Sequence, residues 1–171
     1  MRPLTETDGQ AYRDFRLYML EESPTAFSAD RDETARRPLS HFIERARDDA
    51  ENFIVGAFAG HVLVGSAGGF RDPEPKRRHL AMVWGMYVQP AHRGSGLGAR
   101  LLGAVLDRLH ALPGVEQVQL GVTAGNEPAL RLYERAGFEV YGREPAALKV
   151  AGVNYDELLM SLRLKGGPDP T

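Results

Sequence analysis

The chain has 171 residues, of which 43% are hydrophobic and 26% are charged, and its formal net charge is −2. These values predict one compact domain with a substantial core, and the scattered Lys and Arg residues argue against nucleic acid as a partner. No apolar run is long enough to cross a membrane and the N-terminus lacks the apolar stretch of a signal peptide, so we expect no membrane partner and a cytoplasmic location.

The N-terminal region predicts a short strand and a helix. Residues 2–4 favour a strand, and Thr5 with Asp8 can cap the helix that follows. Pro24 lies in the stretch 21–28 and disfavours helical geometry in the residue before it. We therefore expect a loop there.

A second helix is expected over about residues 30–47. This stretch carries many charges and few apolar side chains, which is typical of a helix that lies on the surface. Its buried contacts are then expected to be Leu39, Phe42 and Ile43.

Three antiparallel strands are predicted next. Apolar runs at residues 52–59 and 62–70 flank Gly60-His61, which favours a hairpin turn. A polar, Pro-containing stretch then leads to a strand over residues 78–89. Gly85 lies inside that strand, where it either marks a β-bulge or makes room for a bulky neighbour.

The run from Val88 to Leu102 is the most informative segment of the chain. An apolar strand ends in a proline-marked turn, glycines follow at 94, 96 and 98, and an amphipathic helix begins directly after them. Glycines let the backbone approach an anion closely, and a helix N-terminus presents unpaired N–H groups and partial positive charge. The run therefore predicts a pyrophosphate site and a nucleotide-type cofactor.

Two other phosphate-binding motifs fit this run poorly. The Gly-Lys-Ser/Thr ending of a P-loop is absent, which argues against a nucleoside triphosphate. The order Gly94-x-Gly96-x-x-Ala99 matches a dinucleotide fingerprint, but that fold needs an acidic residue after the next strand, and Glu116 stands before it. A dinucleotide oxidoreductase is thus the weaker hypothesis for this run of residues.

The helix after the glycines is expected to end at Pro113-Gly114 and to cross over to a strand at 115–122, which is then parallel to the strand before the loop. Asn126 and Gly137 bound a shorter helix. The last two strands are expected at residues 138–143 and 155–164.

Together these elements predict an α/β fold of the α+β, three-layer kind, with a mixed, mostly antiparallel sheet of about six to seven strands and one βαβ unit. Residues 1–164 are expected to form a single domain, and residues 165–171 a flexible tail.

Arg93-Gly94-x-Gly96-x-Gly98 resembles the acetyl-coenzyme A loop of the GCN5-related N-acetyltransferase (GNAT) superfamily. The signature of that loop is Arg or Gln, two residues, Gly, one residue, then Gly or Ala. Arg93, Gly96 and Gly98 match it.

A second segment strengthens the resemblance. Asn126 is followed seven residues later by Tyr133, with a helix exit at Gly137-Phe138, which resembles the other cofactor segment of the superfamily. Almost two helical turns separate the two polar side chains, so both can reach one ligand. Taken without the glycine loop, the pair also fits a capping Asn and a half-buried core Tyr.

The resemblance implies the GNAT fold and an N-acetyltransferase that uses acetyl-CoA as co-substrate. In that family the strand before the loop carries a bulge and pantetheine lies between two diverging parallel strands. Transfer is then expected to be direct, in a ternary complex, to a primary amine of a small molecule. The residues expected to bind the cofactor are Met86, Tyr87, Val88, Arg93, Gly94, Ser95, Gly96, Leu97, Gly98, Ala99 and Asn126.

Tyr133 is the expected catalytic residue. A tyrosine with an ordinary pKa of about 10 is protonated near neutrality and can donate a proton to the leaving thiolate. The general base stays open. Family members that acetylate protein N-termini often carry a Glu at the position of Gly121, which leaves His79, Glu21, Glu22 or a chain of waters.

The acceptor is also left open. The loop at 21–28 and a turn at 149–155 are expected to flank its cleft, and their acidic, aromatic and amide groups suit a small cationic amine. A protein or peptide N-terminus is the alternative acceptor, and a non-catalytic acyl-CoA sensor is the alternative from another class. The five histidines show no paired ligand spacing and the chain has no cysteine, so no metal site is predicted. Exposed late strands could support a homodimer.

Overall fold

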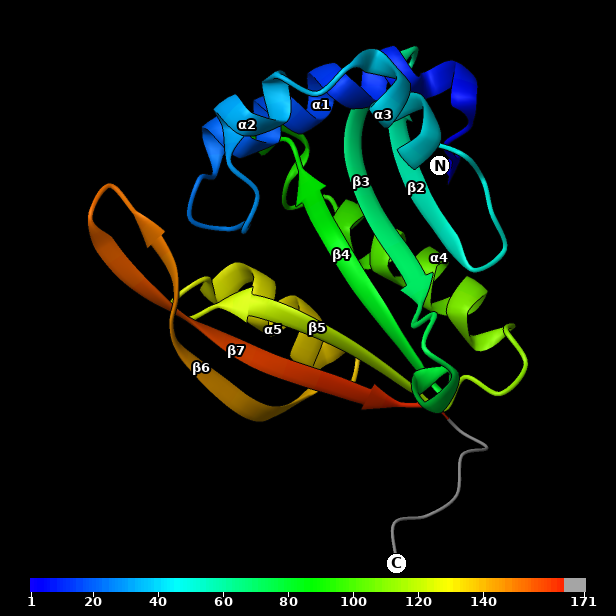
Figure 1. Cartoon of the computed structure of the whole chain (residues 1–171), viewed down its shortest axis with the longest axis vertical. Helices are drawn as coiled ribbons and strands as arrows, with labels where there is room; N and C mark the ends of the chain where they lie inside the picture. Colours follow the sequence, from blue (N-terminus) through cyan, green and yellow to red (C-terminus); the bar gives the residue numbers. More distant parts are fainter. Residues whose placement is uncertain (165–171) are drawn as a thin grey trace, which may run out of the picture.

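The computed structural model describes residues 1–164 and contains a seven-stranded sheet in the order β1-β2-β3-β4-β5-β7-β6 (Figure 1). Neighbouring strands are antiparallel except β4 and β5, which are parallel. The strands are β1 (Arg2–Pro3), β2 (Asn52–Ala59), β3 (Val62–Arg71), β4 (Leu80–Val88), β5 (Gln117–Thr123), β6 (Glu139–Val150) and β7 (Val153–Arg163). This confirms the expected mixed, mostly antiparallel sheet, whereas the expected tail at 165–171 lies outside the described residues.

Helices cover both faces of the sheet. The helices are α1 (Gly9–Glu22), α2 (Arg31–Ala35), α3 (Leu39–Arg45), α4 (Leu97–His110) and α5 (Glu127–Arg135), with short 3₁₀ turns η1 (Glu6–Asp8), η2 (Pro75–Arg77) and η3 (Pro90–His92). The apolar stripe of α4 packs on one face with Val118 and Leu120 of β5. Phe15 of α1 and Phe42 of α3 pack on the other face with Ile54 of β2. The three-layer expectation is therefore confirmed.

The parallel pair β4 and β5 separates soon after it begins (Figure 1). Only Leu80, Ala81 and Met82 pair with β5. Farther along, β4 pairs only with β3, and the register shift between Ser66 and Gly68 places one extra residue in β4. Gly85 has a φ of 60°, a left-handed conformation that a glycine adopts without strain. Of the two alternatives for Gly85, the structure therefore shows the β-bulge, and the sheet opens beside it.

The stretch 30–47 forms two helices instead of the single one expected. Pro38 is the N-cap of α3 with an extended ψ of 157°, and a proline also disfavours helical geometry in the residue before it. Phe42 is buried as expected and Ile43 is half-buried, but Leu39 is 40% exposed because it lies in the first turn of the new helix. The expectation that Leu39 is buried was wrong.

The last hairpin is longer than the sequence predicts. Strand β6 continues past Arg143 to Val150, because a bulge between Glu144 and Leu148 takes up the irregular residues there. Asp156 holds this bulge, since its carboxylate accepts hydrogen bonds from Ala146 N (2.8 Å) and Arg143 Nε (2.7 Å). The same bonds, first that from Ala146 and then that from Arg143, keep the pKa of Asp156 below its ordinary value.

The close packing of Gly68 against Trp84 predicts a stability difference between two glycine substitutions. A Cβ at Gly68 would lie 2.3–2.6 Å from atoms of the Trp84 ring, so Gly68→Ala should lower the free energy of unfolding by about 1–3 kcal/mol. Gly103 of α4 has open space around it, and Gly103→Ala should raise that free energy by roughly 0.5–1 kcal/mol. Urea unfolding measures both changes. Equal effects of the two substitutions would contradict the packing described.

Candidate active site

The glycine loop leads from β4 through η3 into α4 with its backbone exposed. Gly94 and Gly96 have φ values of 77° and 75°, and an added Cβ at either would meet nothing within 4 Å. Gly96 is the N-cap of α4, and the first hydrogen bond of the helix joins Arg100 N to Gly96 O at 3.1 Å. The N–H groups of the first helical turn are thus left without helical partners. An anion can approach them closely.

Arg93 connects this loop to the end of β4 and to α1. Its Nε donates to Val88 O at 2.9 Å, its Nη2 lies 3.1 Å from Glu22 Oε2, and its guanidinium stacks 5.3 Å from the Tyr87 ring centroid. The Tyr87 hydroxyl donates to the same Glu22 oxygen at 2.8 Å. The end of β4, the loop and the C-terminal end of α1 are therefore joined by one hydrogen-bonded cluster.

The hydrogen bonds and charges of this cluster determine the protonation state of Glu22. Hydrogen bonds from Ser23, Tyr87 and Arg93 hold the pKa of Glu22 below its ordinary value. Burial and the neighbouring Glu22 carboxylate raise the pKa of Tyr87, so its hydroxyl stays protonated. Glu22 is consequently a paired carboxylate and not the free acid group that the sequence allowed as a base or as an attractor of cations.

The segment after α1 crosses the opening between β4 and β5. The hydroxyl of Thr123, the last residue of β5, donates to Thr25 O at 2.6 Å. Phe27 packs edge-on against Tyr87 of β4, with ring centroids 6.2 Å apart. One short segment therefore contacts both walls of the opening. It begins at Ser23, because α1 continues through Glu22.

Helix α5 lies beside the glycine loop and β4, since a Cβ added at Gly98 would be 3.5 Å from both Leu132 and Met86. Asn126 Oδ1 accepts the N–H of Ala129 at 3.4 Å, so it caps the helix as the sequence predicts. Tyr133 is 6% exposed and its ring packs edge-on against Phe138, with centroids 6.0 Å apart. Burial raises the pKa of Tyr133 to about 12, so its hydroxyl is a proton donor at neutral pH.

Glu157 is a candidate residue that the sequence analysis missed. It pairs with Thr123 across β7 and β5, and its carboxylate covers Gly121, where an added Cβ would lie only 2.6–2.7 Å from the two carboxylate oxygens. Burial, and then the charge of Glu144, raise the pKa of Glu157. A half-buried carboxylate therefore occupies the space above Gly121. Only the register of β5 and β7 reveals this, because the two residues are far apart in the sequence.

Gly121 and Glu157 belong to the face of the sheet that α4 does not cover. Val118, Leu120 and Val122 of β5 are buried in the core beneath α4, and residues between them point to the opposite face. Thr123, which pairs with Glu157, contacts the segment after α1 on that face. Glu157 is therefore reached from the side of α1.

Residues 1–164 contain no group of three or more His, Asp or Glu side chains placed to hold a metal ion. No helix in the same range combines the length and the apolar character that a membrane span requires.

Comparison with known proteins gives a consistent set of relatives. A family model described as "Acetyltransferase (GNAT) family" matches residues 15–138. A mycothiol acetyltransferase of Brachybacterium faecium is 32% identical over 155 residues, which are 84% of this chain and 46% of that protein. An L-methionine sulfoximine/L-methionine sulfone acetyltransferase of Pseudomonas aeruginosa is 33% identical over 131 residues, 76% of this chain and 72% of that protein. The chain thus spans less than half of the first relative.

Solved structures share the fold. The structure of yncA from Salmonella typhimurium, which contains acetyl-CoA as its cofactor, has a TM-score of 0.81 at 24% identity and covers 99% of this chain and 96% of its own. A GNAT-family acetyltransferase from Streptococcus pneumoniae also has a TM-score of 0.81, at 21% identity, with 95% of this chain and 98% of its own covered. Both likenesses establish the architecture of the sheet and its helices.

Proposed function

This chain belongs to the acetyltransferase (GNAT) family, and from that premise we propose that it moves the acetyl group of acetyl-CoA to a primary amine of a small molecule. The transfer is direct, with both substrates bound together. The observation that carries the proposal is the opening between β4 and β5, which begins after Met82 and lies beside the exposed glycine loop. A phosphate-bearing ligand with a long amide arm fits these two features together.

The backbone supplies the cofactor site in this proposal. The N–H groups from Gly94 to Ala99, with the Ser95 hydroxyl nearby, face the pyrophosphate at the start of α4. The amide groups of the pantetheine arm pair with Met86, Tyr87 and Val88 on the side of β4 that β5 has left. Arg93 adds positive charge beside the loop while it holds the loop on α1, and Asn126 positions α5.

The chemical step needs a base, a stabilised oxyanion and an acid. The amine nitrogen attacks the thioester carbonyl, so the C–N bond forms and the C–S bond breaks. Glu157 takes the proton that the amine loses, and Tyr133 gives its proton to the departing thiolate. The raised pKa of Glu157 makes its carboxylate a better proton acceptor, and the raised pKa of Tyr133 keeps its hydroxyl protonated until the thiolate leaves.

The named activities of relatives support a small acceptor. The relative from Pseudomonas aeruginosa, which the match covers over 72% of its length, is named for an amino acid analogue. A relative from Mycobacterium tuberculosis named N-alpha-acetyltransferase RimI is 38% identical over 104 residues, 60% of this chain. The Glu expected in specialists for protein N-termini is replaced here by Gly121. The small acceptor is therefore favoured over a protein N-terminus.

Release of free coenzyme A thiol from acetyl-CoA tests the proposal. We expect turnover with small primary amines and amino acids, and slower turnover with peptides that have free N-termini. Turnover restricted to peptides would mean that the acceptor is a protein or peptide N-terminus and not a small molecule. Tight binding of acetyl-CoA with no turnover of any amine would mean that the protein is an acyl-CoA sensor and not an enzyme.

Removal of the Tyr133 hydroxyl tests the acid. Tyr133→Phe should lower kcat by about 100-fold or more, because the thiolate then leaves without a proton donor, while the Kd for coenzyme A stays within a few-fold. Steady-state kinetics and calorimetric titration measure the two quantities. Tyr141→Phe is the matched control, since Tyr141 is 54% exposed on β6 and should keep the kcat of the parent protein. An unchanged kcat in Tyr133→Phe would reject the role.

The pH profile tests the base. The protonated Glu157 cannot accept a proton, so kcat/KM should fall as the pH drops through its raised pKa, above the ordinary value of 4.5. Glu157→Gln should lower kcat/KM by about 100-fold at pH 8 and remove this acidic limb. Glu144→Gln should keep the activity and move the limb to lower pH, because the Glu144 charge helps to raise the pKa of Glu157. A limb that stays in Glu157→Gln would assign it to another group.

A further inference from the structure

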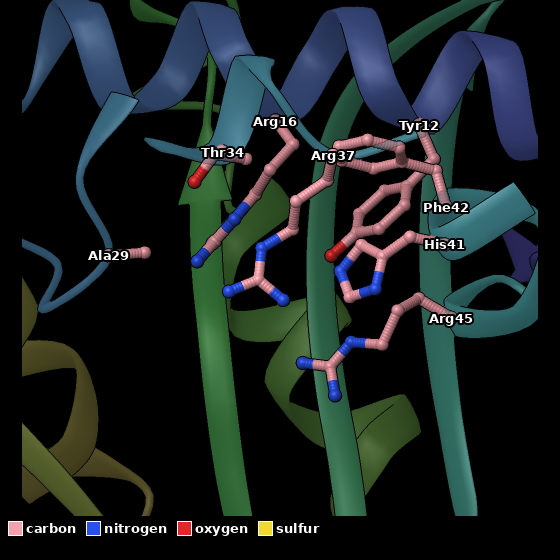
Figure 2. Close-up of a pocket in the computed structure, with 8 residues that line it drawn as sticks. All are labelled: Tyr12, Arg16, Ala29, Thr34, Arg37, His41, Phe42 and Arg45. Carbon is pink, nitrogen blue, oxygen red and sulfur yellow. The ribbon is translucent and has the colours of Figure 1, made fainter. Parts of the chain in front are cut away.

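A cavity of about 220 Å³ lies beneath helices α1, α2 and α3 and contains a group of basic side chains. Figure 2 shows Arg16, Arg37 and Arg45 directed into one space beside His41, with the rings of Tyr12 and Phe42 on one side and the Tyr12 hydroxyl pointing toward Arg37 and His41. The catalytic scheme above uses none of these side chains. The cavity therefore calls for its own explanation.

The cavity lining carries positive charge without an acidic counterpart. No Asp or Glu lines it, and within residues 1–164 no carboxylate lies within 4.0 Å of the guanidinium groups of Arg16 or Arg45. Arg37 contacts Glu33 at 3.1 Å outside the lining. Arg16 is half-buried, whereas Arg37 and Arg45 are exposed. Partial burial of a guanidinium without a counter-charge costs free energy, so an anion from outside the chain would stabilise the charge of Arg16.

The titration behaviour of the cavity agrees with its geometry. Burial lowers the pKa of Arg16. Burial, and then the charges of Arg37 and Arg45, lower the pKa of His41, so the imidazole is neutral at pH 7. The cavity thus disfavours additional positive charge, which is the behaviour expected where several cations lie close together.

The cavity adjoins the bulge of β4. The Arg45 guanidinium lies 4.2 Å from the ring centroid of Trp84, and Arg16 Nη1 lies 3.6 Å from the position of a Cβ added at Gly85. These β4 residues stand where the strand has already separated from β5. Helix α4, at whose start the cofactor phosphates are proposed to bind, packs on the other face of the sheet. The cavity therefore lies on the α1 side of the sheet, the side from which Glu157 is reached, and not on the side of the proposed phosphate site.

We propose that the arginine cavity binds a carboxylate of the acceptor, so that the substrate is an amine that also carries an anionic group, as an amino acid does. This rests on the proposed function and narrows its substrate class. The planar guanidinium of Arg16 presents two parallel N–H groups, which match the two oxygens of a carboxylate. The aromatic rings of Tyr12 and Phe42 suit an acceptor with a hydrophobic or polarizable side chain. The acidic character that the sequence predicts for the acceptor cleft is absent from this cavity, since its charged residues are cations.

A binding measurement tests the site without any acetyl transfer. Trp84 is the only tryptophan of the chain and contacts Arg45, so its fluorescence reports on the cavity. Titration of the full-length chain with butyrate should give a saturable change, whereas butyramide, which has the same shape and no charge, should give none. Arg16→Gln should raise the Kd for butyrate by about 10- to 100-fold, as expected for loss of a charge-assisted hydrogen-bonded pair.

Arg36→Gln is the matched control. Arg36 neighbours Arg37 in the chain, is exposed and lies outside the cavity lining, so its removal changes the net charge equally and should leave the Kd for butyrate unchanged. Thermal unfolding verifies that each variant folds. If Arg16→Gln does not fold, the exposed Arg37→Gln supplies the test with the same expected direction.

The difference expected between a carboxylate and the corresponding neutral amide also applies to turnover. L-methionine should be acetylated with a KM at least 10-fold below that of L-methioninamide, and Arg16→Gln should raise the first KM about 10- to 100-fold and leave the second unchanged. Butyrate without a saturable signal, or equal effects on both amines, would overturn the carboxylate site even if acetyl transfer occurs. Butyrate binding that depends on Arg16, with no thiol release for any amine, would instead leave the anion site standing and reject the proposed function.

Discussion

The loss of β5 as a hydrogen-bond partner beyond Met82 is the constraint on which the structure of the site depends. A strand inside a sheet normally satisfies its N–H and C=O groups on both sides, and unpaired backbone groups away from water are costly. Strand β4 continues to Val88 with β3 on one side only, and Gly85 turns it out of line through its positive φ. The chain thus exposes a row of backbone groups in its interior, which a ligand with amide groups of its own can complete.

Two contacts hold the walls of this opening in place. Glu22 binds both Tyr87 and Arg93, which fixes the end of β4 and the glycine loop on α1. Thr123 binds Thr25, which ties the end of β5 to the segment after α1. Fixed walls reduce the conformational entropy that the protein loses when ligands bind, and they hold the groups of the site in place.

The features that local sequence determines were predictable, and those that depend on strand register were not. The glycine loop, the cap at Asn126 and the bulge at Gly85 each follow from the backbone preferences of single residues. Pro38 also carried a local signal, which the long helix expected over 30–47 overlooked. Glu157 gave no such signal, because its relation to Gly121 exists only through the pairing of β5 with β7. The arginine cavity likewise gathers side chains from separate helices, none of which is unusual in its own segment.

Backbone hydrogen exchange with and without acetyl-CoA tests most directly whether the opened sheet and the glycine loop form one cofactor site. Acetyl-CoA should slow exchange at the β4 amides beyond Met82 and in the first turn of α4, with little change in the hairpin of β6 and β7. NAD at the same concentration should give no such protection. Protection confined to other segments, or the same protection by NAD, would contradict this cofactor site.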